Sequence, residues 1–129
     1  MGLSDRDGTA HGTAHVRDLF ENNHAIMLLI DPETATIVDA NPAACTFYGW
    51  SREEFVSKPI SLVNPSPPGE VHGYIKSAQS AKRRYFRFTH KLADGSDREV
   101  EVYSGPVTYD DRTLLLSVIH DVTARVAVE

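Results

Sequence analysis

Residues 37–55 constrain the fold of this chain more strongly than any other stretch, because each change of direction there carries its own signal. The β-branched residues at 36–38 favour a strand. Asn41 offers a side-chain oxygen as an N-cap, and Pro42 suits the first helical position. Gly49 can adopt the left-handed conformation that ends a helix. The stretch therefore predicts a strand, a short helix and a sharp corner.

A second helix is predicted directly after that corner. Ser51 and Glu54 form a Ser-x-x-Glu capping box, and Trp50 and Phe55 occupy the positions of a hydrophobic staple. Before this region, residues 26–30 form an apolar run of strand length, and residues 31–34 form a turn cluster. The strands at 26–30 and 36–39 should therefore pair as a hairpin that leads into the two helices.

Residues 60–81 continue the helical region. A helical turn is predicted at 60–63, and residues 64–69 form a loop because they contain three prolines and a glycine. A longer helix is predicted over 68–81, where one apolar stripe recurs at helical spacing. The residues of that stripe are Val71, Tyr74, Ile75 and Ala78.

From Arg84 the apolar period changes to two, which is typical of strands. Phe86, Phe88 and His90 should face one way along the first of these strands. Turn signals follow at residues 93–96 and 110–112, with strands predicted over 99–104 and 113–119. Gly105-Pro106 is expected to kink the second strand, because proline lacks a ladder donor. Local patterns thus predict two strands, a helical insert and three further strands in a meander.

Composition sets broad limits on function. The chain has 129 residues, enough for one domain, and a net charge of −5 argues against a phosphate-binding surface. Lys82-Arg83-Arg84 is the only basic cluster and is interpreted as the solvated end of a helix. The longest apolar run is too short to span a bilayer. The single cysteine excludes an internal disulfide and fits a reducing, cytoplasmic setting.

The order of motifs resembles that of the PAS domain, a sensory module of many bacterial signalling proteins. The resemblance rests on Asp-Ala-Asn-Pro-Ala-Ala at 39–44 and Tyr-Gly-Trp-Ser-Arg-Glu-Glu-Phe at 48–55. The segment Leu-Phe-Glu-Asn-Asn at 19–23, the hairpin Asp-Gly-Ser at 94–96 and His-Asp-Val-Thr-Ala-Arg at 120–125 add to it. It covers residues 16–129, which include the start of a C-terminal exit helix, and residues 1–15 are interpreted as a flexible leader.

The resemblance implies an α+β fold, in which a helical insert covers one face of a five-stranded antiparallel sheet and encloses a ligand cavity. The residues expected to line that cavity are Phe47, Tyr74, Ile75, Phe86, Phe88, His90 and Val102. For His90 two interpretations stay open: contact with a ligand, or satisfaction by a neighbouring side chain or water. Asp121, Thr123 and Arg125 are expected to relay the signal from the sheet to the exit helix.

Other residues with reactive side chains have simpler interpretations. Cys45 is interpreted as a structural cysteine, because the Asn-Cys-Arg-Phe motif of covalent flavin members is absent. His72 points away from the apolar stripe, which argues against a haem ligand. Asp110 and Asp111 fit a hairpin turn. Because no persuasive catalytic or metal-ligating arrangement is found, the chain is not expected to be an enzyme or to bind a metal.

The function expected from the resemblance is that of a cytoplasmic sensory domain. It would bind a small ligand or a partner and relay its state to a C-terminal effector, a histidine kinase of a two-component system or a diguanylate cyclase. A homodimer is expected, without nucleic acid. The alternatives are a ligand-free dimerisation module, which would use the helix at 16–20 and the exposed sheet face, and a haem-binding gas sensor.

Overall fold

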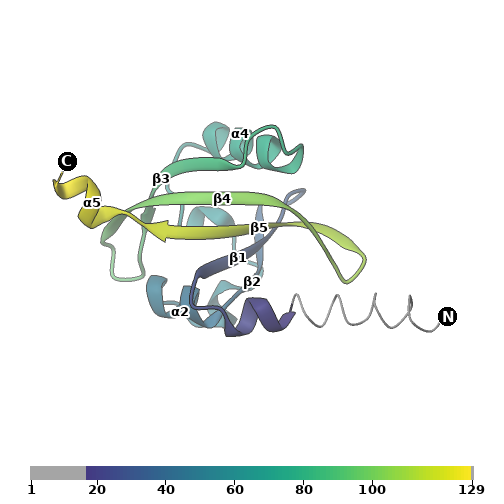
Figure 1. Ribbon diagram of the computed structural model, residues 1–129, viewed down its shortest axis with the longest axis horizontal. Helices are drawn as coiled ribbons and strands as arrows, with labels where there is room; N and C mark the ends of the chain where they lie inside the picture. Colours follow the sequence, from purple (N-terminus) through teal and green to yellow (C-terminus); the bar gives the residue numbers. More distant parts are fainter. Residues whose placement is uncertain (1–16, 129) are drawn as a thin grey trace.

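The computed structural model describes residues 17–128, so the predicted leader at 1–15 lies outside the described residues. Its framework is a five-stranded antiparallel sheet in the order β2-β1-β5-β4-β3 (Figure 1). The strands are β1 Ile26–Asp31, β2 Thr36–Ala40, β3 Tyr85–Lys91, β4 Asp97–Tyr109 and β5 Arg112–Asp121. The helices are α2 Pro42–Tyr48, α3 Arg52–Phe55, the 3-10 helix η1 Ile60–Leu62, α4 Pro68–Gln79 and α5 Thr123–Val128, and residues 17–22 are also helical.

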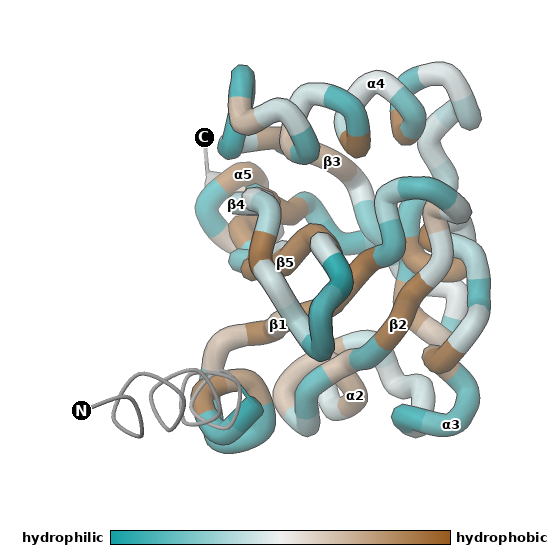
Figure 2. The backbone as a smooth tube through the Cα atoms, turned by 90° about the vertical axis from the view of Figure 1, so that its right-hand side faces the viewer, coloured by the Kyte–Doolittle hydropathy of each residue, from teal (hydrophilic) through white to brown (hydrophobic). Residues whose placement is uncertain are grey.

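The corner between β2 and α3 has the predicted structure. The Asn41 side chain accepts a hydrogen bond from the Ala44 amide, and Gly49 ends α2 with a φ of 87°. Ser51 and Glu54 form both hydrogen bonds of the capping box that begins α3. These local bonds turn the chain twice within a few residues, so that α2 and α3 lie at the β1–β2 side of the sheet (Figure 2).

The main core lies between the helical insert and one face of the sheet, the inner face. Leu28, Ile30, Leu115 and Ile119 supply it from β1 and β5, and Phe55 and Ile75 supply it from the insert. Figure 2 shows the corresponding hydrophobic stretches along the central strands. A second, smaller cluster lies on the opposite, outer face, where Phe20 packs against Leu29 and Leu114. The helix at 17–22 therefore covers part of the outer face.

Gly105-Pro106, where a kink was expected, does not interrupt β4, which continues through both residues, and Pro106 pairs with Leu115 of β5. The Ser104 amide donates to the Arg84 carbonyl, so the amide positions of even-numbered residues in β4 point toward β3. The backbone nitrogen of Pro106 therefore also points to the β3 side, but β3 pairs with β4 only as far as Tyr103. The missing donor therefore faces no strand and costs no ladder bond.

Asp110 and Asp111 form the two-residue turn between β4 and β5, as predicted. Both have positive φ angles, 48° and 63°, which is the geometry of a type I′ hairpin turn. No helix within the described residues is long and apolar enough to cross a membrane.

Candidate functional site

The interior of the sheet holds a buried histidine that meets a tyrosine from α2. His90 on β3 is 3% exposed, and its Nδ1 shares a hydrogen bond of 2.7 Å with the Tyr48 hydroxyl. Burial lowers the pKa of His90 to about 4, so the imidazole is neutral near pH 7. Of the two interpretations left open for His90, a neighbouring side chain is present as its partner.

A second polar group in the interior joins α4 to the two central strands. The Tyr74 hydroxyl lies 2.8 Å from the hydroxyls of both Ser104 and Ser117, which lie 2.6 Å from each other. All three side chains are buried, and burial raises the pKa of Tyr74. The three hydroxyls therefore satisfy one another, which removes the cost of burying them.

Between these two polar groups lies a cavity of only about 10 Å³, close to the space of a single water molecule. Its lining residues are Leu28, Ile30, Ile60, Asn64, Tyr74, Phe88, His90, Val102, Ser117 and Ile119. The structure thus brings four of the seven expected cavity residues together: Tyr74, Phe88, His90 and Val102. Side chains fill nearly all of the space that a ligand would need.

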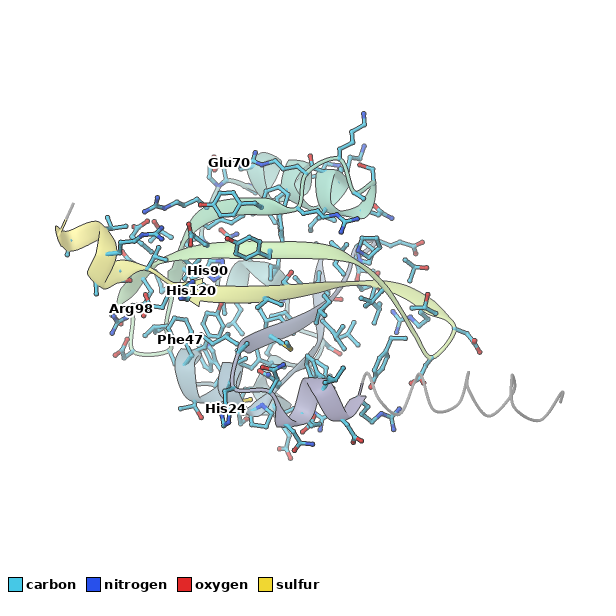
Figure 3. The ribbon with its side chains drawn as sticks, in the orientation of Figure 1. His24, Phe47, Glu70, His90, Arg98 and His120 are labelled. Carbon is cyan, nitrogen blue, oxygen red and sulfur yellow. The ribbon has the colours of Figure 1, made fainter. Side chains whose placement is uncertain are left out.

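The other three expected residues lie elsewhere. Ile75 and Phe86 are buried in the same core but do not line this cavity. Phe47 is half-buried on α2 and lines an open groove against residues 21–26 instead (Figure 3). The helical pattern places Phe47 on the same apolar face of α2 as Tyr48. Such a local pattern does not distinguish a residue at the centre of the core from one at its edge.

The remaining reactive side chains lie outside the interior cavity. His72 is exposed on α4, in agreement with its angle on the helical pattern. Cys45 is half-buried, and burial, with a smaller contribution from Asp39, raises the pKa of its thiol. A thiol with a raised pKa is a poor nucleophile near neutral pH.

The exit helix α5 is joined to β4 by a compact set of hydrogen bonds. Thr123 Oγ1 accepts from the Glu99 amide at 2.9 Å and donates to Asp121 Oδ1 at 2.6 Å. Asp121 Oδ1 also accepts from the Thr123 amide. The Val122 amide donates to the Glu99 carbonyl, and the Val122 side chain is buried. Two of the expected relay residues, Asp121 and Thr123, therefore contact each other and β4.

The third expected relay residue, Arg125, reaches a different acidic residue. Arg125 Nη2 donates to Glu101 Oε2 at 2.9 Å, whereas Asp121 lies 3.6 Å from Arg98 (Figure 3 labels Arg98 at this end of β4). Glu101 Oε2 also accepts from the Tyr85 hydroxyl at 2.7 Å, and these two hydrogen bonds lower the pKa of Glu101.

Sequence reasoning therefore missed Glu99 and Glu101 as members of this joint. Their alternation with Val100 and Val102 does indicate that they face away from the core. Their partners, however, lie more than twenty residues further along the chain, and that pairing depends on how α5 leaves the sheet.

Comparison with known proteins identifies the class of this domain. The family model described as the PAS fold matches residues 14–122, which is most of the chain. The chain therefore belongs to the PAS family, and the sheet order and helical insert described above agree with that assignment.

Among curated proteins, the chain is similar to the diguanylate cyclase DgcM of Escherichia coli K12, with 38% identity over 114 residues. The match covers 85% of this chain but 27% of DgcM, and the DgcM of strain O157:H7 matches to the same extent. The chain thus spans about a quarter of the length of the curated relatives that it matches.

Solved PAS domains share the fold. The PAS domain of an HTR-like protein from Haloarcula marismortui superposes with a TM-score of 0.72 at 20% identity, covering 92% of this chain and 98% of that one. A PAS domain from Colwellia psychrerythraea gives 0.73 at 19% identity, covering 87% and 98%. These identities are low enough that the likeness concerns the fold alone.

Proposed function

We propose that this PAS sensory domain is the input domain of a larger signalling protein and controls a C-terminal effector, a diguanylate cyclase in the first instance and a histidine kinase in the second. The similarity to DgcM supports the first choice of effector. The observation that carries the proposal is the joint between β4 and α5, where Asp121, Thr123 and Arg125 hold the helix through side-chain hydrogen bonds.

The proposed mechanism is a shift between two populations of the joint. A ligand or a partner that favours one arrangement of the sheet changes the free energy of docking α5 onto β4, and the effector responds to the position of α5. The bonds of the joint are half-exposed, so each contributes little to global stability, yet together they define the direction in which the chain leaves the sheet.

The test uses the full-length protein that carries this domain, with effector output as the readout. Asp121→Ala and Arg125→Ala should each abolish regulation of the effector. The rate of cyclic dinucleotide synthesis should then equal that of a variant that lacks residues 17–122. Both variants should keep a cooperative unfolding transition. Lys58→Ala, an exposed change away from the joint, is the control and should keep normal output. Normal regulated output from both joint variants would refute the relay.

A double-variant experiment examines the pairing inside the joint. Glu101→Ala and Arg125→Ala both remove the hydrogen bond between these two side chains, so the double variant should be no worse than the stronger single variant. Effects that add in full would show that Arg125 acts through another contact.

We also propose that the input is a small ligand held near Tyr74, Phe88, His90 and Val102, with Phe47, Ile75 and Phe86 as surrounding residues. Because the cavity holds only about 10 Å³, a ligand larger than water requires the insert to move away from the sheet. Native mass spectrometry of the purified domain tests this proposal: a retained small molecule supports it. A cytoplasmic location is part of the proposal, and the single cysteine, Cys45, is consistent with it.

The filled interior favours a second candidate function, a ligand-free module that forms homodimers. The outer face of the sheet offers exposed aromatic surface at Tyr85 and Tyr103, which are 38% and 48% exposed and pack against each other. If this face forms the dimer, Tyr103→Glu should convert dimers to monomers in light-scattering measurements. A domain that is monomeric at all concentrations would exclude this candidate.

A further inference from the structure

β3 is an edge strand of the sheet, and part of its backbone has no partner on the open side. The Arg84 carbonyl bonds to Ser104 of β4, whereas the Lys91 amide donates to Val63, away from β4. In an antiparallel ladder the backbone groups of successive residues point to alternate sides. Arg87 and Thr89 therefore point their amides and carbonyls to the open edge, and no bond from another described segment covers them.

A groove runs along this open edge, between β3 and α4. It consists of two adjoining hollows of about 350 Å³ and 300 Å³, which share Glu70, Arg87 and Phe88 as lining residues. Gly73 on α4 lines the larger hollow, and a Cβ at that position would meet nothing within 4 Å. The groove thus has room beside the strand for side chains of an added segment.

The surroundings of the groove are basic, although the chain as a whole carries a net charge of −5. Lys82, Arg83 and Arg84 lead into β3, and Arg87 lies on it. Within the described residues, no carboxylate lies within 4.0 Å of any of these four cations. Arg83 is held in place, because its Nε donates to the Tyr85 carbonyl and its guanidinium lies 4.7 Å from the centre of the Phe86 ring.

Two acidic residues also line the groove, but one of them is already engaged. Glu99 accepts a hydrogen bond of 2.8 Å from the Thr89 hydroxyl. Glu70 lies on α4 at the opposite wall (Figure 3). Glu101 also lies opposite Arg87 on β4, but its carboxylate is engaged by Tyr85 and Arg125. Four cations near three carboxylates, two of which are already engaged, leave an excess of positive charge along the strand.

We propose that the open edge of β3 is a docking site for an extended acidic segment of a partner protein, which adds a sixth strand to the sheet. Backbone bonds to Arg87 and Thr89 would hold the segment, as in other cases of strand addition. Alternate side chains would enter the groove beside Phe88, and acidic side chains on the other face would lie beside Arg87, close to the basic residues Lys82, Arg83 and Arg84 that lead into β3. A second copy of β3 is a poor occupant, because it would bring like charges together across the new pair.

The test uses a labelled eight-residue peptide of alternating valine and glutamate, added to the domain at low ionic strength. Amide hydrogen exchange, followed by NMR, should slow about tenfold at Arg87 and Thr89, while the amide of Phe88, which already faces β4, should not change. Added salt should weaken binding. A peptide with lysine in place of glutamate, and a glutamate peptide with a central proline, should not bind.

Variants of the protein examine the charge requirement. Arg84→Glu should weaken binding of the glutamate peptide about tenfold without lowering the unfolding midpoint, since its side chain is exposed. Arg87→Gln should also weaken binding, and glutamine avoids placing a second carboxylate opposite Glu101 on β4. Lys58→Glu makes the same charge change as Arg84→Glu far from the groove and should leave binding intact. Failure of the glutamate peptide to bind, equal binding of the lysine peptide, or binding that leaves exchange at Arg87 and Thr89 unchanged would overturn the proposal. So would protection that rises with protein concentration alone, which would indicate a second copy as the occupant.

Discussion

At the scale of single residues, Asn41 shows how one side chain can do more than its local pattern predicts. The sequence indicates an N-cap, and Oδ1 does accept from the Ala44 amide at 2.9 Å. The same oxygen accepts from the Met27 amide, and Nδ2 donates to the Ala25 carbonyl at 2.8 Å. Asn41 therefore ties α2 to β1. The cap was predictable from neighbouring residues, but the bonds to β1 depend on the position of a strand fourteen residues away.

His90 leads to a prediction about pH. Its pKa is lowered from 6.5 to about 4 in the folded domain, so below pH 6.5 the unfolded chain binds a proton that the folded domain does not. The contribution of the neutral, buried His90 to folding stability is therefore complete above pH 6.5 and is lost as the pH falls toward 4. At about 1.4 kcal/mol per pKa unit, His90 should account for a loss of roughly 3 kcal/mol in the free energy of unfolding.

The measurement is urea unfolding at several pH values. His90→Gln should remove most of this pH dependence and keep a polar partner for the Tyr48 hydroxyl. His72→Gln, a change at an exposed histidine, should unfold like the original domain at every pH. If the free energy of unfolding depends on pH equally in the two variants, His90 can be protonated in the folded state.

At the scale of elements, the docking of α5 depends on Thr123. Replacing it with valine removes the hydroxyl that accepts from the Glu99 amide and donates to Asp121. We expect Thr123→Val to speed amide exchange at Val126, whose amide bonds to the Val122 carbonyl, by more than tenfold. Global stability should fall by only about 1 kcal/mol, because the bonds are at the edge of the domain.

Thr108→Val, an exposed threonine-to-valine change in β4, is the matched control for that experiment. It should leave exchange at Val126 unchanged. If Thr123→Val unfolds the whole domain, the threonine belongs to the core of the fold rather than to a joint.

The elements themselves were largely predictable, since caps, turn residues and apolar periods are local signals. The hairpin at Asp110-Asp111 follows from residues that tolerate positive φ angles. The kink at Pro106 could not be judged locally, because the cost of a missing donor depends on whether a neighbouring strand is present. β3 pairs with β4 only up to Tyr103, and nothing near Pro106 in the sequence states that.

At the scale of the whole molecule, the central feature is a PAS interior that is packed almost solid. Because side chains alternate along a strand, it was predictable that Phe88, His90 and Val102 face the interior. The hydroxyl cluster was not, because Ser117 lies within an apolar run and meets Tyr74 only when α4 packs on the sheet. Local patterns thus indicate which side chains enter the interior, but they do not indicate how completely those side chains fill it.

Because the interior is so tightly packed, we predict that a small aromatic ligand can replace a phenylalanine ring that is removed by substitution. Phe88 is half-buried between the interior cavity and the groove at the edge of β3, so Phe88→Ala should lower the free energy of unfolding by about 2–3 kcal/mol and leave an apolar pocket. Toluene should then raise the thermal midpoint of Phe88→Ala but not that of the original domain.

Phe47→Ala is the control, because Phe47 lines a different, open groove and does not line the interior cavity. Toluene should not stabilise that variant. If toluene raises the midpoint of the original domain as much as that of Phe88→Ala, the interior opens readily without any substitution.

One oxygen atom, Glu101 Oε2, accepts from both Tyr85 on the edge strand and Arg125 on the exit helix. Two donors that share one acceptor are thermodynamically coupled, because a change at one alters the charge available to the other. Any partner that moves the Tyr85 hydroxyl must therefore change the affinity of α5 for the sheet. By reciprocity, the docked or released state of α5 must change the affinity of that partner by the same factor.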